Sequence, residues 1–191
     1  MDLFDIAEST YSNDPTTKPI GYYKLYQDFL LHHKVSPNSI LEIGTYKGES
    51  TKVFAKAFPN SKIVALDIQL RDIDFSDCPN VIYLAADQSN SSQLALVIQQ
   101  HFSDGIDLVI EDASHVGFLS KITFDAVFPF VKSRGVYFIE DWGTGYWDSW
   151  IDGGRYQEFP LTIHAGNLPK RIPSHDFGMV GFVKETLHNS A

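Results

Sequence analysis

From residue 40 onward, the chain alternates short apolar runs rich in β-branched residues with longer segments of helical periodicity. This alternation is typical of an α/β protein in which parallel strands form the centre and helices cover both faces. The apolar runs are continuous instead of alternating with polar residues, which suits strands buried on both faces. We expect strands at about 40–43, 62–66, 81–85, 106–110 and 135–139.

Four other segments carry apolar residues at mixed spacings of three and four, as helices packed on a sheet do. They predict helices over 21–34, 50–58, 91–102 and 120–132, the last kinked or shortened at Pro129. The first helix precedes the sheet, so residues 1–35 are interpreted as a helical or lid segment of one domain spanning 1–191. Segments 161–165 and 178–185 are predicted as two more strands, an antiparallel pair that closes the sheet.

Composition limits the class of partner. No apolar run approaches the roughly 20 residues of a membrane-spanning helix, so we expect no membrane contact. The net charge of −9 argues against nucleic acid as a partner, because binding to a phosphate backbone needs clustered Lys and Arg. The N-terminus lacks the pattern of a signal peptide, and the single cysteine, Cys78, cannot form an internal disulfide. Both features predict a cytoplasmic protein.

The first strand leads into a glycine-bearing turn, E-I-G-T-Y-K-G-E-S (42–50), followed by a helix. Such a turn lets backbone amides approach a ligand at the point where doubly wound sheets bind ligands. Asp67 ends the second strand, where it would accept hydrogen bonds from ribose hydroxyls. Asp87 follows the third, where it either receives an adenine amino group or caps the next turn. The turn lacks the G-x-G-x-x-G spacing, which disfavours the alternative of an NAD-dependent oxidoreductase.

Two predicted strands end in paired acids, V-I-E-D-A-S-H (109–115) and Y-F-I-E-D-W (137–142). Neighbouring parallel strands end side by side, so Asp112, Glu140 and Asp141 are expected to converge. No Lys or Arg lies within five residues of them, and a bound cation or shared protons would offset their repulsion. Oxygen ligands favour Mg²⁺, Mn²⁺ or Ca²⁺ over zinc. Turn capping in solvent is the alternative for these acids.

His115 follows Asp112 by three residues, where it either faces the same site as a base or caps the next helix. An imidazole titrates near neutral pH and is suited to removing a proton from a hydroxyl. The aromatic loop 142–156 either binds an acceptor or packs against the domain, and His164 and His175 are assigned to structure or surface.

The pattern E-x-G-x-x-x-G after strand one, with Asp67 and Asp87 after strands two and three, resembles class I S-adenosylmethionine-dependent methyltransferases. The resemblance implies a Rossmann-like fold with a mostly parallel seven-stranded sheet, and S-adenosylmethionine as cofactor. E-I-G-T-Y-K-G-E-S is also similar to a loop of catechol O-methyltransferases, which implies that Ser50 and nearby amides hold the methionine carboxylate. The cofactor-binding residues so implied are Glu42, Gly44, Tyr46, Ser50, Asp67 and Asp87.

The stretches D-L-V-I-E-D-A-S-H and F-P-F-V-K-S-R-G-V-Y-F-I-E-D-W resemble the metal-dependent O-methyltransferases of macrolide and rhamnosyl sugars, a group that includes cephalosporin hydroxylase-like proteins. The resemblance implies that Asp112, Glu140 and Asp141 bind Mg²⁺ or Mn²⁺ and that His115 is the catalytic base, acting beside Asp112. The implied acceptor is a small hydroxylated molecule, preferentially a sugar of a glycosylated natural product. A catechol-type enzyme and a non-catalytic cofactor-binding module are the alternatives.

Larger sugar-methylating relatives carry an additional N-terminal region, whereas this chain has a short leading segment. Two explanations stay open for the acceptor pocket. It is either smaller than in those relatives or completed by another subunit of a homo-oligomer.

Overall fold

The structure is a computed structural model that describes residues 3–10, 18–147, 150–151 and 178–189. Five parallel strands form one sheet in the order β3-β2-β1-β4-β5. All five predicted strands are confirmed. Their bounds are β1 Ser39–Ile43, β2 Lys62–Asp67, β3 Val81–Ala85, β4 Ile106–Glu111 and β5 Val131–Ile139.

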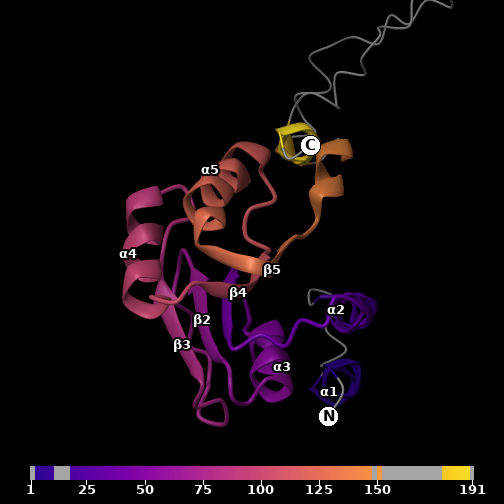
Figure 1. Ribbon diagram of the computed structural model, residues 1–191, viewed down its shortest axis with the longest axis vertical. Helices are drawn as coiled ribbons and strands as arrows, with labels where there is room; N and C mark the ends of the chain where they lie inside the picture. Colours follow the sequence, from indigo (N-terminus) through magenta and orange to yellow (C-terminus); the bar gives the residue numbers. More distant parts are fainter. Residues whose placement is uncertain (1–2, 11–17, 148–149, 152–177, 190–191) are drawn as a thin grey trace, which may run out of the picture.

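Helices cover both faces of the sheet, as the sequence predicts (Figure 1). One hydrophobic cluster joins the sheet to α1, α2 and α3, and includes Ile40 and Ile63. The other joins the opposite face to α4 and α5, and includes Leu41 and Val64. These neighbouring strand residues are all buried, which explains the continuous apolar runs. The helix bounds are α1 Leu3–Thr10, α2 Ile20–His32, α3 Glu49–Ala57, α4 Ser91–His101 and α5 Gly117–Val127.

Pro129 limits the helix before β5, as predicted. Helix α5 ends at Val127, and the chain continues as a short 3-10 helix, η1 (Phe128–Phe130), that contains the proline. A second 3-10 helix, η2 (Trp142–Tyr146), follows β5. Helix α1 is an element that the sequence pattern did not predict separately.

Among the described helices, none combines the length and the apolar character needed to cross a membrane.

The predicted strand at 178–185 is wrong, because these residues belong to helix α6 (Gly178–Asn189). Met179, Val180 and Phe182 are buried, and the Phe182 ring lies 5.8 Å from that of Phe124 on α5. A Cβ on Gly117 would lie 2.1 Å from the backbone of Gly178, so the two helices approach with no side chain between them. Short apolar runs do not distinguish strand from helix by periodicity.

The described sheet therefore has five strands and not the predicted seven. The other predicted strand, 161–165, lies outside the described residues, as does most of the aromatic loop.

Asp107 connects β4 to the start of β1 at the amino ends of these strands. Its Oδ2 accepts hydrogen bonds from the amides of Asn38 and Ser39, at 2.9 and 3.1 Å, and Lys132 Nζ lies 3.0 Å from Oδ1. Replacing Asp107 with alanine removes these acceptors, so we expect the free energy of unfolding to fall by about 1–3 kcal/mol. Urea denaturation at pH 7 measures the change, with the exposed Asp104→Ala as control.

The contribution of Asp107 depends on pH. Partial burial alone would raise the pKa of its carboxyl, but Lys132 and the donors of Asn38 and Ser39 hold the pKa below its ordinary value. A lowered pKa in the folded state stabilises the protein above the unfolded value of about 3.9, and this stabilisation is lost as the pH falls through the folded pKa. The difference between wild type and Asp107→Ala should therefore shrink below about pH 4. A difference that stays constant down to pH 2.5 would contradict this assignment.

Candidate active site

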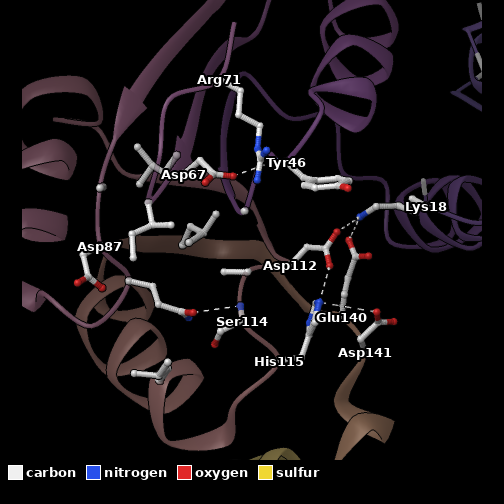
Figure 2. Close-up of a pocket in the computed structure, with 18 of the residues that line it drawn as sticks. Lys18, Tyr46, Asp67, Arg71, Asp87, Asp112, Ser114, His115, Glu140 and Asp141 are labelled. Atoms are coloured by element: carbon white, nitrogen blue, oxygen red, sulfur yellow. Dashed lines mark hydrogen bonds and ion pairs between the residues drawn. The ribbon is translucent and has the colours of Figure 1, made fainter. Parts of the chain in front are cut away.

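A pocket of about 660 Å³ opens at the carboxyl ends of the strands. It lies where the strand order reverses between β1 and β4, which is where open α/β sheets bind ligands. Figure 2 shows Asp67 and Asp87 toward one end of the pocket and the acids after β4 and β5 toward the other. The predicted residues that line it are Gly44, Tyr46, Asp67, Asp87, Asp112, His115, Glu140 and Asp141.

Gly44 brings the two ends of the pocket together. Its φ is +98°, and a Cβ at this position would lie 2.1 Å from the backbone oxygen of Asp112. Only glycine combines this conformation with so close an approach. The turn after β1 thus packs directly against the acidic turn after β4, and the ligand sites of both turns share one cavity.

Asp67 fixes the conformation of the turn after β1. Its Oδ2 accepts hydrogen bonds from the amides of Thr45 and Tyr46, at 3.1 and 2.8 Å, and its Oδ1 accepts one from Gln69 at 3.1 Å. A carboxylate offers about four acceptor positions, so one remains for a ligand hydroxyl. The Arg71 guanidinium lies over the Tyr46 ring, 4.9 Å from its centroid, at the mouth of the pocket.

Glu42 and Ser50, both predicted to bind the cofactor, do not line the pocket. They lie buried beneath the turn, where Ser50 and Thr51 donate hydrogen bonds to the Glu42 carboxylate. Burial raises the pKa of Glu42, and the two hydroxyls oppose this shift. In this arrangement the two residues support the turn from below instead of facing a ligand.

Asp87 lies at the rim of the pocket and accepts hydrogen bonds from the amide and hydroxyl of Ser89, at 2.8 and 2.7 Å. These bonds lower the pKa of Asp87, so it remains a carboxylate acceptor. The capping role that the sequence left open for Asp87 is therefore present, and the residue also faces the pocket.

At the acidic end, His115 lies between two carboxylates. Its Nε2 is 3.6 Å from Asp112 Oδ1 and 3.8 Å from Asp141 Oδ2. One ligand atom from each of the three residues lies within 4.8 Å of the others. Ligands about 2.1 Å from an octahedral Mg²⁺ lie roughly 3 to 4 Å apart, so a small inward movement would let these side chains hold a divalent cation.

Glu140 is directed toward the N-terminal segment. Its Oε1 accepts hydrogen bonds from the Tyr26 hydroxyl and from Lys18 Nζ. Burial raises the pKa of Glu140, and the Lys18 ammonium opposes this shift. On the neighbouring acid, Asp141 Oδ1 accepts a hydrogen bond from the Tyr22 hydroxyl at 2.9 Å. Burial and Asp141 raise the pKa of Tyr22 to about 12, so it stays a donor.

Lys18 is the functional residue that sequence reasoning missed. The acids have no cationic neighbour in sequence, but Lys18 Nζ lies 3.0 Å from Asp112 Oδ2 and also pairs with Glu140, 122 residues away. The sequence indicates a bound cation or shared protons as the means of offsetting the repulsion, and Lys18 supplies a further one from a distant part of the chain. Tyr22 and Tyr26 lie one turn apart on the same face of α2, and Lys18 lies four residues before Tyr22, just ahead of the helix. This spacing of four was the signal available in the sequence.

Three residues that line the pocket have strained backbone conformations. Tyr46, His115 and Asp141 have φ values of 47°, 53° and 50°, in the left-handed region that costs non-glycine residues free energy. The carbonyl of His115 accepts hydrogen bonds from Thr144 Oγ1 and Trp150 Nε1, at 3.2 and 3.0 Å. These contacts hold His115 in the conformation that directs its ring toward the acids.

Glu111, the first acid of V-I-E-D-A-S-H, lies on the other side of the strand from the pocket acids. Its Oε1 accepts hydrogen bonds from Ser120 Oγ and Gln88 Nε2, at 3.1 and 3.2 Å. Burial raises the pKa of Glu111 to about 7. The Gln88 amide oxygen in turn accepts a hydrogen bond from the Ser114 amide at 3.1 Å. Glu111 thereby supports the turn that carries His115.

Comparison with known proteins places this geometry in context. No protein-family model matches the chain. The sequence is 33% identical over 180 residues to mycinamicin VI 2''-O-methyltransferase of Micromonospora griseorubida, covering 80% of this chain and 42% of the relative. It is 30% identical over 129 residues to the 8-demethyl-8-(2-methoxy-alpha-L-rhamnosyl)-tetracenomycin-C 3'-O-methyltransferase of Streptomyces olivaceus, covering 64% of this chain and 32% of the relative. The chain thus spans less than half the length of these relatives.

The fold is similar to that of the MycE methyltransferase from the mycinamycin biosynthetic pathway, solved in complex with Mg, SAH and mycinamycin VI. The TM-score is 0.72 at 23% identity, over 98% of this chain and 47% of the solved chain. The fold is therefore that of S-adenosylmethionine-dependent methyltransferases, as the strand ends predicted. Within that class, the sequence relatives of this chain are sugar O-methyltransferases of macrolide and tetracenomycin pathways.

Proposed function

We propose that the chain is an S-adenosylmethionine-dependent, divalent-metal-dependent O-methyltransferase that acts on a sugar hydroxyl of a glycosylated natural product. One observation carries the proposal. A single pocket joins the end formed by Gly44, Asp67 and Asp87 to the cluster of Asp112, His115 and Asp141. Methyl donor and acceptor hydroxyl would share this space, and their alignment would supply much of the rate enhancement.

The positions of the residues in the pocket support the roles proposed for them. Asp67 and Asp87 would bind the ribose and adenine ends of the cofactor, and Asp112 and Asp141 would hold Mg²⁺ or Mn²⁺, with Glu140 as a further ligand. The metal, when bound, would lower the pKa of the acceptor hydroxyl.

His115 would accept the hydroxyl proton as the acceptor oxygen forms a bond to the methyl carbon and the bond from sulfur to methyl breaks. The products would be the methyl ether and S-adenosylhomocysteine, with the proton left on His115. The 3.6 Å between His115 Nε2 and Asp112 Oδ1 supports this role, because base and metal ligand would serve the same oxygen.

The acceptor class is supported by the sequence relatives, which methylate mycinamicin VI and a rhamnosyl tetracenomycin. Methyl transfer from radiolabelled S-adenosylmethionine to those two compounds, and to catechol, tests the proposal with Mg²⁺ and with EDTA. We expect Mg²⁺-dependent transfer to a glycosylated compound. Transfer to catechol alone would favour the catechol-type alternative, and cofactor binding without transfer to any hydroxyl compound would favour a non-catalytic module.

Replacing Asp67 with alanine should weaken cofactor binding. The change removes an acceptor for the ribose hydroxyls and frees the amides of Thr45 and Tyr46. Loss of hydrogen bonds to a charged group predicts a Kd for S-adenosylhomocysteine that is about 10- to 100-fold higher. Calorimetry measures this change, with the exposed Asp72→Ala as the matched control. An unchanged Kd would place the ribose elsewhere.

A further inference from the structure

Three oxygen acceptors surround the Lys18 ammonium. Its Nζ lies 3.0 Å from Asp112 Oδ2 and 3.4 Å from the Tyr26 hydroxyl, and it pairs with Glu140 Oε1. An ammonium has three donors, and these three acceptors match them. The Lys18 side chain is 5% exposed, as is that of Glu140, so the ion pair is buried. Figure 2 shows Lys18 directed toward Asp112 and Glu140.

The same carboxylates are required by a metal ion. Asp112 belongs to the cluster with His115 and Asp141, and Glu140 is the further acid expected to join it. Lys18 contacts both Asp112 and Glu140, so its positive charge lies beside the position that a divalent cation would take. Two cations a few ångströms apart repel strongly in a partly buried site, where screening by water is weak.

The Lys18 ammonium can move away from the carboxylates without disturbing α2. It precedes Pro19 and the first helical residue, Ile20, so its backbone lies outside α2. Its four-carbon side chain can move the ammonium away without unfolding the helix. Tyr22 and Tyr26, which lie within α2, would keep their hydrogen bonds to Asp141 and Glu140.

We propose that Lys18 is the resident counter-ion of the acidic site and competes with the divalent cation for Glu140 and Asp112. The inference rests on the proposed function, because it takes a divalent cation to bind at these acids. In the metal-free protein Lys18 keeps the carboxylates together. When the metal binds, Lys18 withdraws from them, and the affinity for metal is weaker than the acids alone would give.

Mn²⁺ binding to the metal-stripped protein tests this competition, measured by electron paramagnetic resonance of the free ion. Lys18→Met removes the charge and keeps a side chain of similar length. We expect it to bind Mn²⁺ at least tenfold more tightly than wild type. Lys18→Arg keeps a positive charge and should bind no more tightly than wild type. Lys24→Met, an exposed lysine of α2 paired with Asp28, is the matched control and should equal wild type.

Thermal melting gives a second measurement. Lys18→Met leaves Asp112 and Glu140 without a cation, so in EDTA its Tm should fall below that of wild type. Saturating Mn²⁺ should then raise the Tm of Lys18→Met about 3–5 °C more than it raises that of wild type. If Lys18→Met does not fold in EDTA, its folding on addition of Mn²⁺ supports the inference, and failure to fold under both conditions overturns it.

The outcomes separate this inference from the proposed function. Mn²⁺ binding by wild type with equal or weaker binding by Lys18→Met overturns the competition and leaves the metal site standing. Mn²⁺ binding by Lys18→Met alone supports the competition, because Lys18 then excludes the metal, but it contradicts the metal-dependent part of the proposed function for the wild-type protein. Binding by neither protein overturns the inference together with the metal-dependent part of the proposed function.

Discussion

Replacing Asp112 with alanine is expected to abolish binding of the divalent cation and, with it, methyl transfer. One oxygen of Asp112 lies 3.6 Å from His115 Nε2, and the other accepts a hydrogen bond from the Lys18 ammonium at 3.0 Å, so this carboxylate contacts both basic side chains at the acidic end of the pocket. We expect the Kd for Mn²⁺ to rise at least about 100-fold, as loss of a supporting residue alone costs 10- to 100-fold. If the metal contributes several kcal/mol to the transition state, kcat/KM should fall about 10³-fold.

Paramagnetic resonance and initial rates at saturating S-adenosylmethionine measure the two effects of Asp112→Ala. The control is Asp125→Ala, an exposed aspartate of α5 that pairs with Lys121. S-adenosylhomocysteine should bind both variants with nearly the wild-type Kd, because Asp67 and Asp87 are untouched. Wild-type rates in Asp112→Ala with EDTA present would rule out the metal mechanism.

Replacing His115 with alanine should lower kcat about 10²- to 10⁴-fold, the range of a lost general base. It should leave the Kd values for Mn²⁺ and S-adenosylhomocysteine within about threefold of wild type, because His115 acts on the acceptor proton in our account.

The two roles open to His115 are distinguished by the same variant. Its Nε2 belongs to the cluster that could hold a metal, so a ligand role predicts a large loss of Mn²⁺ affinity in His115→Ala. A loss of kcat with retained Mn²⁺ binding supports the base, and a parallel loss of both supports the ligand. His101→Ala, on α4 and outside the pocket, is the control.

The five described strands and the edge of the sheet that carries the site were predictable, because local sequence determines both. Leu41, Val64 and Val109 lie in strands buried on both faces, and such strands are continuous apolar runs in any parallel sheet. Residues that follow parallel strands lie at the same edge of the sheet, whatever the details of packing. Asp67, Asp87, Asp112 and His115 therefore lie in one pocket, as expected.

The features that were not predicted are the contact of Lys18 with the acids, the buried position of Glu42 and helix α6. They depend on contacts between different elements of the fold. Lys18 pairs with Glu140 across 122 residues, and no local pattern around the acids indicates this contact. Glu42 is the second-last residue of β1, and hydrogen bonds from Ser50 and Thr51 on α3 hold it beneath the turn. Met179 and Phe182 are apolar in a run too short to show a period, and packing against α5 decides in favour of a helix.

Calorimetric titration of the purified, metal-stripped protein with S-adenosylhomocysteine and then with Mn²⁺ tests the central claim most directly. The account predicts that both ligands bind, that the Mn²⁺ heat disappears in Asp112→Ala, and that the S-adenosylhomocysteine heat persists there. Binding of S-adenosylhomocysteine without Mn²⁺ would contradict the metal mechanism while leaving the cofactor site. Binding of neither ligand would contradict the proposal that this pocket is the active site of a methyltransferase.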